Sequence, residues 1–183
     1  MNKHLCLLAL LALSACGTSP DPDYYTLTSV DGPRQMQTEP MTIKLRRPGL
    51  PATLDRPEMV STSGNNVSYS DNHLWSEPLD RMIERVLADD LGKRLPNSAV
   101  ITESGGMVVE PDAIIDLEIQ KFGANENGRP ELAAIVSVYQ GEIARAPQRI
   151  VLQGEGGSMP ASFSQLLGQL ADRIAISLDQ GHR

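Results

Sequence analysis

Two segments of the chain have the apolar spacing of an amphipathic helix. In both, leucine, isoleucine, valine or phenylalanine recurs every three or four residues. The first set is Leu79, Ile83, Val86, Leu87, Leu91 and Leu95, and the second is Phe163, Leu166, Leu167, Leu170, Ile174 and Leu178. Each stripe predicts a helix that buries one face in a core. A helix lying on a membrane surface, the alternative for the first segment, would carry Lys and Arg along its polar face.

The residues around these segments predict how the helices begin. Ser76 is placed to cap the first helix, Glu77 suits its positive N-terminal end, and Pro78 is tolerated in a first turn. Ser162 and Gln165 have the spacing of a capping box at the start of the second helix. Both helices are therefore expected to begin with a side-chain cap.

Alternating apolar and polar residues predict strands in the rest of the chain. Between residues 112 and 122, isoleucine and leucine alternate with acidic residues and glutamine, which is typical of a strand with one solvent-facing side. Residues 132–139 are apolar on both faces, as in a central strand, and residues 149–152 are its expected partner. Shorter strands are predicted at residues 24–27 and 41–45.

Turn residues connect two pairs of these strands. Gly64 and the two asparagines after it predict a hairpin between residues 59–61 and 67–69, and Asn127-Gly128 predicts a second turn within residues 123–130. The order of elements is then strands, helix, strands, helix. This order predicts an α+β fold, a mixed β-sheet with two amphipathic helices packed on it. A doubly wound α/β sandwich is the alternative.

The N-terminal residues have the pattern of an export signal. Lys3 precedes an apolar run at residues 5–13, which is too short for a membrane span of about 20 residues. The sequence Leu13-Ser14-Ala15-Cys16 then matches a lipobox, in which the chain is cut before the cysteine and the thiol receives diacylglycerol. An ordinary signal peptide with a chance cysteine is the alternative. Gly17, in place of an aspartate, favours sorting to the outer membrane.

Composition limits what the exported chain can do. We expect a cleaved signal peptide at residues 1–15, a lipidated tether at residues 16–23 and a single domain at residues 24–183. The formal net charge of the whole chain is −7, and loss of Lys3 makes it more acidic, so no nucleic-acid partner is expected. Cys6 leaves with the signal, and the mature chain therefore has no internal disulfide.

No residue pattern of an enzyme or a metal site is found in the sequence. His73 lies far from the other two histidines, in the cleaved signal and the C-terminal tail, and zinc sites take three or four clustered ligands. Asp116 and Glu118 lie on the polar side of a predicted strand, where carboxylates usually serve solubility. No nucleophile elbow, phosphate-binding loop or dinucleotide fingerprint occurs. We therefore expect a protein that is not an enzyme and needs no cofactor or metal.

One proline-stiffened loop stands out as a candidate for recognition. It runs as Leu50-Pro51-Ala52-Thr53-Leu54-Asp55-Arg56-Pro57-Glu58 and presents two leucines and a charged pair. A crossover whose leucines cover the core is the alternative. Three further features accompany this loop, namely Cys16, the start Tyr24-Tyr25-Thr26-Leu27 and the segment Leu74-Trp75-Ser76-Glu77-Pro78-Leu79. In these four features the chain resembles a known family, the PqiC-like, or ABC-type transport auxiliary, lipoproteins. That family commonly has Arg before the tryptophan and Ala after it, where this chain has Leu74 and Ser76.

The resemblance implies a function and a set of partners. It implies a non-enzymatic outer-membrane lipoprotein that docks the periplasm-spanning tunnel of an MCE-domain (PqiB-like) lipid-transport system, with a homo-oligomeric ring as a further expectation. Cys16 would anchor the chain in the outer membrane. The partner-binding residues would be Leu50, Pro51, Leu54, Asp55, Arg56, Pro57, Trp75, Glu77 and Pro78. The alternative is a stand-alone outer-membrane lipoprotein that binds lipid or cell-wall material itself.

Overall fold

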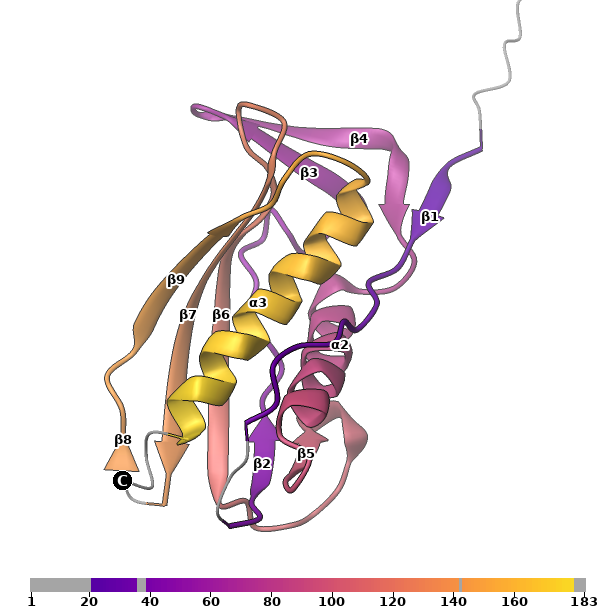
Figure 1. Ribbon diagram of the computed structural model, residues 1–183. Coiled ribbons are helices and arrows are strands. Elements are labelled where there is room, and N and C mark those ends of the chain that lie inside the picture. The colour runs from indigo at the N-terminus through magenta and orange to yellow at the C-terminus, as the bar shows by residue number, and fades with distance from the viewer. Residues whose placement is uncertain (1–20, 36–38, 142, 180–183) are drawn as a thin grey trace, which may run out of the picture.

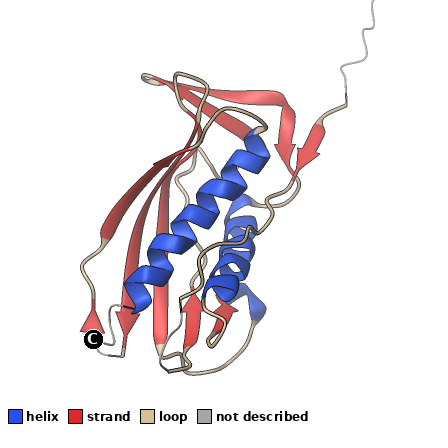
Figure 2. Ribbon diagram, viewed as in Figure 1, coloured by secondary structure: helices blue, strands red, loops and turns tan. Residues whose placement is uncertain are grey.

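The computed structural model describes residues 21–35, 39–141 and 143–179, so the predicted signal peptide and Cys16 lie outside it. The strands are β1 (Asp23–Tyr25), β2 (Thr42–Leu45), β3 (Glu58–Ser63), β4 (Asn66–Trp75), β5 (Ala99–Thr102), β6 (Ala113–Ala124), β7 (Pro130–Gln140), β8 (Ile143–Ala144) and β9 (Gln148–Gln153). The helices are α2 (Leu79–Arg94), α3 (Met159–Asp179) and the short 3-10 turn η2 (Glu103–Gly105). This mixture confirms the predicted α+β class (Figures 1 and 2).

The strands of the described residues form one mixed sheet around β6. On one side β6 pairs antiparallel with β7, which in turn pairs with β8 and β9. On the other side β6 pairs parallel with β2 near its start and with β3 at its end. β5 extends the sheet from β2, and β4 and β1 extend it from β3. The turn glycines of the two predicted hairpins, Gly64 and Gly128, both have positive φ, which confirms the turns.

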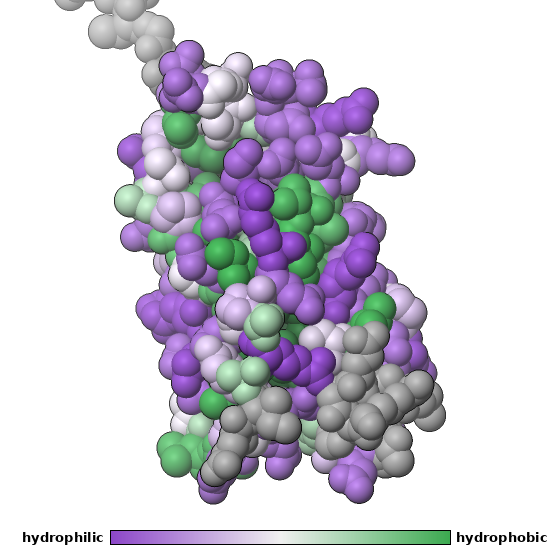
Figure 3. All heavy atoms as spheres, turned by 90° about the vertical axis from the view of Figure 1, so that its left-hand side faces the viewer, coloured by the Kyte–Doolittle hydropathy of each residue, from purple (hydrophilic) through white to green (hydrophobic). Residues whose placement is uncertain are grey.

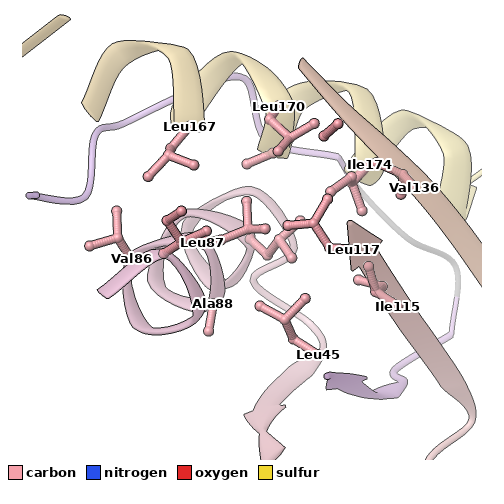
Figure 4. Packing of buried hydrophobic residues seen from close by; sticks show 14 of the residues in the cluster. Leu45, Val86, Leu87, Ala88, Ile115, Leu117, Val136, Leu167, Leu170 and Ile174 are labelled. Atoms are coloured by element: carbon pink, nitrogen blue, oxygen red, sulfur yellow. The ribbon is translucent and has the colours of Figure 1, made fainter. Parts of the chain in front are cut away.

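Both described helices pack on the same face of this sheet, which excludes the doubly wound alternative (Figure 1). All twelve apolar positions of the two predicted stripes are buried. Figure 4 shows Leu167, Leu170 and Ile174 of α3 meeting Leu87 of α2 and Leu117 of β6. The interior between sheet and helices is therefore filled by aliphatic side chains, whose removal from water supplies the main stabilising free energy.

Neither α2 nor α3 covers the opposite face of the sheet, and this corrects the expectation for β7. Val136 and Val138 face the helices and are buried, as predicted. Ile135 is only half-buried, and Tyr139 is 36% exposed on the other face. β7 is central because β6 and β9 flank it, but its second face is only partly covered, since Ala133 is buried there while Ile135 and Tyr139 are not.

The predicted helix caps are wrong. α2 begins at Leu79 with Pro78 as its N-cap residue, and no side chain caps it. Ser76 is instead held by β1, because its backbone N–H donates to Tyr25 O at 2.8 Å. α3 begins at Met159, so Ser162 lies in its first turn, where its hydroxyl donates to Glu155 O at 3.3 Å. The apolar spacing identified both helices but not the residues at which they begin.

A strap of N-terminal chain between β1 and β2 crosses the two helices (Figure 1). We use strap for residues 26–35. Its backbone N–H groups donate to side chains of both helices: Leu27 N to Met82 Sδ at 3.0 Å, Thr28 N to Ser164 Oγ at 3.1 Å and Val30 N to Asp90 Oδ1 at 2.7 Å. Gly168 lets the strap approach α3, because a Cβ there would lie 2.2 Å from Val30 Cγ2. The strap is therefore fixed to the helices before the chain enters β2.

A buried guanidinium joins the strap to both helices. Arg94 is 1% exposed, and its Nε donates to Asp172 Oδ1 of α3 at 2.5 Å. Its Nη1 donates to the carbonyl oxygens of Val30, at 3.1 Å, and Asp90, at 2.9 Å. Asp90 is fully buried beside it, and its Oδ2 has no hydrogen-bond partner among the described residues. Burial raises the pKa of Asp90 to about 6, although the N–H of Val30 and the charge of Arg94 act in the other direction.

We expect Asp90 to make stability depend on pH. Because its folded pKa lies above the unfolded value of 3.8, the folded state binds the proton more tightly, and stability falls as pH rises through 6. Between pH 7 and pH 5 the wild type should gain about 1 kcal/mol more than Asp90→Asn. Urea unfolding at both pH values measures this difference. The exposed neighbour variant Asp89→Asn should keep most of the wild-type gain, because the charge of Asp89 is only a minor cause of the raised pKa of Asp90. An equal gain in all three proteins would contradict the assignment.

Three aromatic side chains close the core near the start of the helices. Trp75, at the end of β4, is 4% exposed, and its ring centroid lies 5.9 Å from Phe122 and 6.0 Å from Phe163. Phe122 and Phe163 stack at 4.4 Å. These contacts join β4, β6 and α3, so Trp75 is part of the core.

Truncation of Trp75 should therefore destabilise the fold. We expect Trp75→Ala to lower the free energy of unfolding by about 3–5 kcal/mol, because it leaves a cavity among the aromatic rings. The matched control is Tyr24→Ala, since Tyr24 is 65% exposed and its loss should cost less than about 0.5 kcal/mol. Urea denaturation followed by circular dichroism measures both, and a small loss for Trp75→Ala would place the indole outside the core.

Candidate partner-binding surface

The leucines of the predicted recognition loop cover the core. Leu54 is 5% exposed and belongs to the hydrophobic core, and Leu50 packs against that core from a half-buried position. The backbone N–H of Leu54 donates to Pro51 O at 2.8 Å, which closes a turn that holds Leu54 inward. The alternative of a crossover that caps the core is thus the correct one for these two leucines.

Most of the other loop residues are exposed to solvent, whereas the predicted binding residue Pro51 is half-buried. Asp55, Arg56 and Pro57 are exposed. Arg56 donates two hydrogen bonds to the carboxylate of Glu58, at 3.1 and 3.2 Å, and its guanidinium lies 4.2 Å from the centre of the Tyr69 ring. The bonds from Arg56 lower the pKa of Glu58. This charged apex is held in one geometry by its own β-hairpin.

The second predicted segment lies directly beside this apex. The backbone N–H of Trp75 donates to Pro57 O at 2.6 Å, which joins the end of β4 to the loop. Pro78 is exposed, and Glu77 is partly exposed and accepts a hydrogen bond from Arg85 Nη2 of α2 at 2.5 Å. The loop at residues 50–58 and the segment at residues 74–79 are thus neighbours in the fold, although 16 positions separate Glu58 from Leu74 in the chain.

We call the exposed part of this region the docking surface, made of Asp55, Arg56, Pro57, Glu77 and Pro78. Its side chains carry both charge signs, and two prolines restrict its backbone. Trp75 and Leu54 lie beneath it and fix its shape. Partner binding at this surface stays a prediction, but the side chains available for it are the polar ones and the prolines.

The described residues contain neither a cluster of metal-ligating side chains nor a helix that could span a membrane. Among the described residues, no group of three or more His, Cys, Asp and Glu side chains could hold a metal ion. His73 is exposed on β4, and its Nδ1 lies 3.3 Å from the Tyr25 hydroxyl. Neither of the long helices in the described part of the chain combines the length and hydrophobicity of a membrane span.

Three features of the surface were missed from the sequence. β5 was not predicted, and the segment after it exposes Met107, Val108 and Val109 at 61%, 100% and 46%. β9 is a sheet edge, since it pairs only with β7 among the described strands, and it exposes Val151. Three apolar residues in a row outside any periodic segment are the signal that could have found the first of these.

Comparison with known proteins places these features in a family. A family model for the ABC-type transport auxiliary lipoprotein component matches residues 25–175. No curated protein matches the chain. A crystal structure of an uncharacterized protein is similar at 16% identity, with a TM-score of 0.72 over 87% of this chain and 99% of that one. A Xanthomonas campestris protein of the DUF330 family is similar at 13% identity, with a TM-score of 0.69 over 84% of this chain and 92% of that one.

These two structures share the fold of the chain, and the family match covers nearly all of the residues that carry the resemblance found in the sequence. The chain belongs to the family of ABC-type transport auxiliary lipoprotein components.

Proposed function

We propose that this protein is the non-enzymatic outer-membrane component of an MCE-type intermembrane lipid-transport system, in which it docks the periplasm-spanning tunnel at the outer membrane and supports envelope integrity. The observation that carries the proposal is the family match over residues 25–175, together with the lipobox that ends at Cys16. Gly17 in the sorting position supports the outer membrane as the site of anchoring.

The docking surface supports a role in binding a protein partner. Its charged apex is preorganised, because Arg56 is already paired with Glu58 and stacked on Tyr69. A rigid surface loses less entropy on association than a mobile loop would. Arginine is also among the residues that contribute most to binding free energy at protein interfaces. The partner in this proposal is the MCE-domain (PqiB-like) protein that forms the tunnel.

A stand-alone lipoprotein that binds lipid or cell-wall material remains the second candidate. The sequence could not show whether a large apolar cavity separates the sheet from the helices. In the described residues this space is occupied by buried side chains of β2, β6, β7, α2 and α3 (Figure 4). This packing favours the docking role over a ligand held in the interior.

The docking role predicts a binding defect without a folding defect. The lipidated protein, purified from detergent-solubilised envelopes, should bring down an MCE-domain protein. Arg56→Glu should reduce that recovery at least tenfold, which corresponds to about 1.4 kcal/mol or more. Because the Arg56–Glu58 pair is exposed, the variant should unfold at nearly the same urea concentration as wild type. Identification and quantification of the co-purified proteins by mass spectrometry is the measurement.

The matched control is Arg129→Glu, which makes the same charge change at an exposed position in the turn between β6 and β7. It should retain full recovery. Recovery that survives both Arg56→Glu and Pro78→Asp would contradict docking through this surface. Repeated recovery of lipid alone, or of nothing, would favour the stand-alone binder.

The two edges of the sheet support a ring of several copies as part of this proposal. On one edge, a groove of about 420 Å³ lies between β9 and α3, with exposed Val151 and Ile176 flanked by Arg149 and Arg173. Figure 3 views this side of the molecule and shows hydrophobic atoms gathered in the middle of a polar face. On the opposite edge, β5 is followed by the exposed apolar run 107–109, flanked by Glu103 and Glu110.

These edges are different surfaces with complementary charge. A contact between two different surfaces is heterologous, and such contacts generate closed rings when the rotation between copies closes. An edge strand with exposed apolar residues is also a site at which another chain can add. A ring built in this way would match a tunnel made of several subunits.

The ring predicts a specific effect of one substitution. The lipidated protein in detergent should form a closed oligomer, and Val151→Asp should convert it to monomer, because the charge would be buried at the contact. Val67→Asp is the matched control, since Val67 is exposed to a similar extent on the β3–β4 hairpin. Mass photometry or crosslinking gives the copy number. A wild-type protein that stays monomeric at all concentrations would contradict the ring.

A further inference from the structure

An apolar pocket lies where α3 begins beneath the β3–β4 hairpin. Its volume is about 310 Å³, and its lining includes Tyr25, Met59, Tyr69, Met159 and Phe163. Figure 1 shows the first turn of α3 reaching β3 and β4 at the end of the molecule where β1 enters the sheet. The pocket is thus built from five elements, β1, β3, β4, the end of β6 and α3. Its floor, Phe163, stacks with Phe122 and packs against Trp75.

The lining fits the body of a flexible hydrocarbon chain. Met59 and Met159 supply unbranched thioether side chains, which adapt to ligands of irregular shape. Polar groups lie at the edge of the pocket, where the Tyr25 hydroxyl is 3.3 Å from His73 Nδ1 in an exposed pair. A ligand that is apolar along its length and polar at one end would match both parts. An acyl chain that ends in an ester has this chemistry.

The path of the chain brings this pocket to the membrane. β1 pairs parallel with β4, with Asp23 opposite His73 and Tyr25 opposite Trp75, so the chain enters the fold along the strand that lines the pocket. Cys16 precedes Asp21 by five residues, which span at most about 18 Å. Tyr24, on β1 beside the pocket, is 65% exposed, and tyrosine is enriched at the level of lipid headgroups. The pocket therefore lies within a short tether of the anchoring bilayer.

We propose that this pocket takes one acyl chain of a phospholipid from the membrane in which the protein is anchored. The proposal rests on lipidation at Cys16 and is independent of docking to a tunnel protein. The bound chain would enter between the β3–β4 hairpin and the first turn of α3 and end against Phe163. Its ester group would lie beside the Tyr25–His73 pair.

The fluorescence of Trp75 can detect the bound chain. It is the single tryptophan of the protein, and its ring lies 6.0 Å from the Phe163 ring at the floor of the pocket. Bromine atoms on an acyl chain quench tryptophan at short range. The full lipidated protein is reconstituted in phosphatidylglycerol and phosphatidylethanolamine vesicles whose acyl chains carry bromine near their ends. The Trp75 emission is compared with that in vesicles of the same lipids without bromine.

Two variants place a carboxylate in the pocket. Met159→Asp changes the first residue of α3, where an acidic group is favourable to the helix, so the fold should be retained. Met59→Asp changes the pocket from the β3 side. Val67→Asp is the control, because it introduces the same charge on the same hairpin but outside the pocket.

The expected result is at least twofold quenching for the wild type and for Val67→Asp, with most of the emission restored in Met159→Asp and Met59→Asp. Bromine is present only on the vesicle lipids, so occupation by the protein's own lipid or by a protein segment would give no quenching. Absence of quenching in the wild type would overturn the proposal. Equal quenching in all four proteins would overturn it as well, because it would report the nearness of the bilayer alone. Recovery of a tunnel protein in the pull-down is a separate result and can fail independently.

Discussion

The buried guanidinium of Arg94 is the constraint on which the arrangement of the domain depends. One side chain bonds to the carboxylate of Asp172 in α3 and to a backbone oxygen of the strap, while it projects from the last turn of α2. Removing such a charge from water is costly, and the bonds from Nε and Nη1 to Asp172, Val30 and Asp90 offset part of that cost. The helices must therefore meet at one angle, with the strap lying across them. The sheet, packed on the other side of both helices, follows this geometry.

Regular patterns in the sequence predicted the parts of the fold that have a period. The spacing of leucine and isoleucine identified α2 and α3, and alternation identified β6, because burial of one face imposes that order locally. Such local patterns could not predict contacts between residues that are distant in the sequence. Arg94 and Asp172 are 78 residues apart, and each lies off its apolar stripe, so the sequence marked them only as polar. β5 was missed because its apolar residues, Ala99, Val100 and Ile101, follow one another without alternating with polar ones.

The candidate surface was likewise predictable in its local segments and not in the contacts between them. The sequence predicted its two segments, and the bond between Trp75 and Pro57 brings them together. The sequence did not predict which side chains of these segments face outward. Leu54 lies in an irregular loop and Trp75 at the last residue of β4, where the direction of a side chain depends on what packs against it from elsewhere. Here Leu54 packs into the core and Trp75 against the two phenylalanines. The exposed residues of the docking surface are its charged residues and its two prolines.

The parallel pairing of β1 with β4 determines how the domain responds to force from its anchor. A pull on the N-terminus acts along β1, so the three residue pairs with β4 are loaded in shear and must break together. Beyond them, the same pull reaches the strap, whose bonds lead into both helices. Tension between membrane and domain is thus spread over the sheet edge and the helix pair in turn. In a membrane-anchored lipoprotein, this arrangement can keep the surface of the domain in place while the membrane fluctuates.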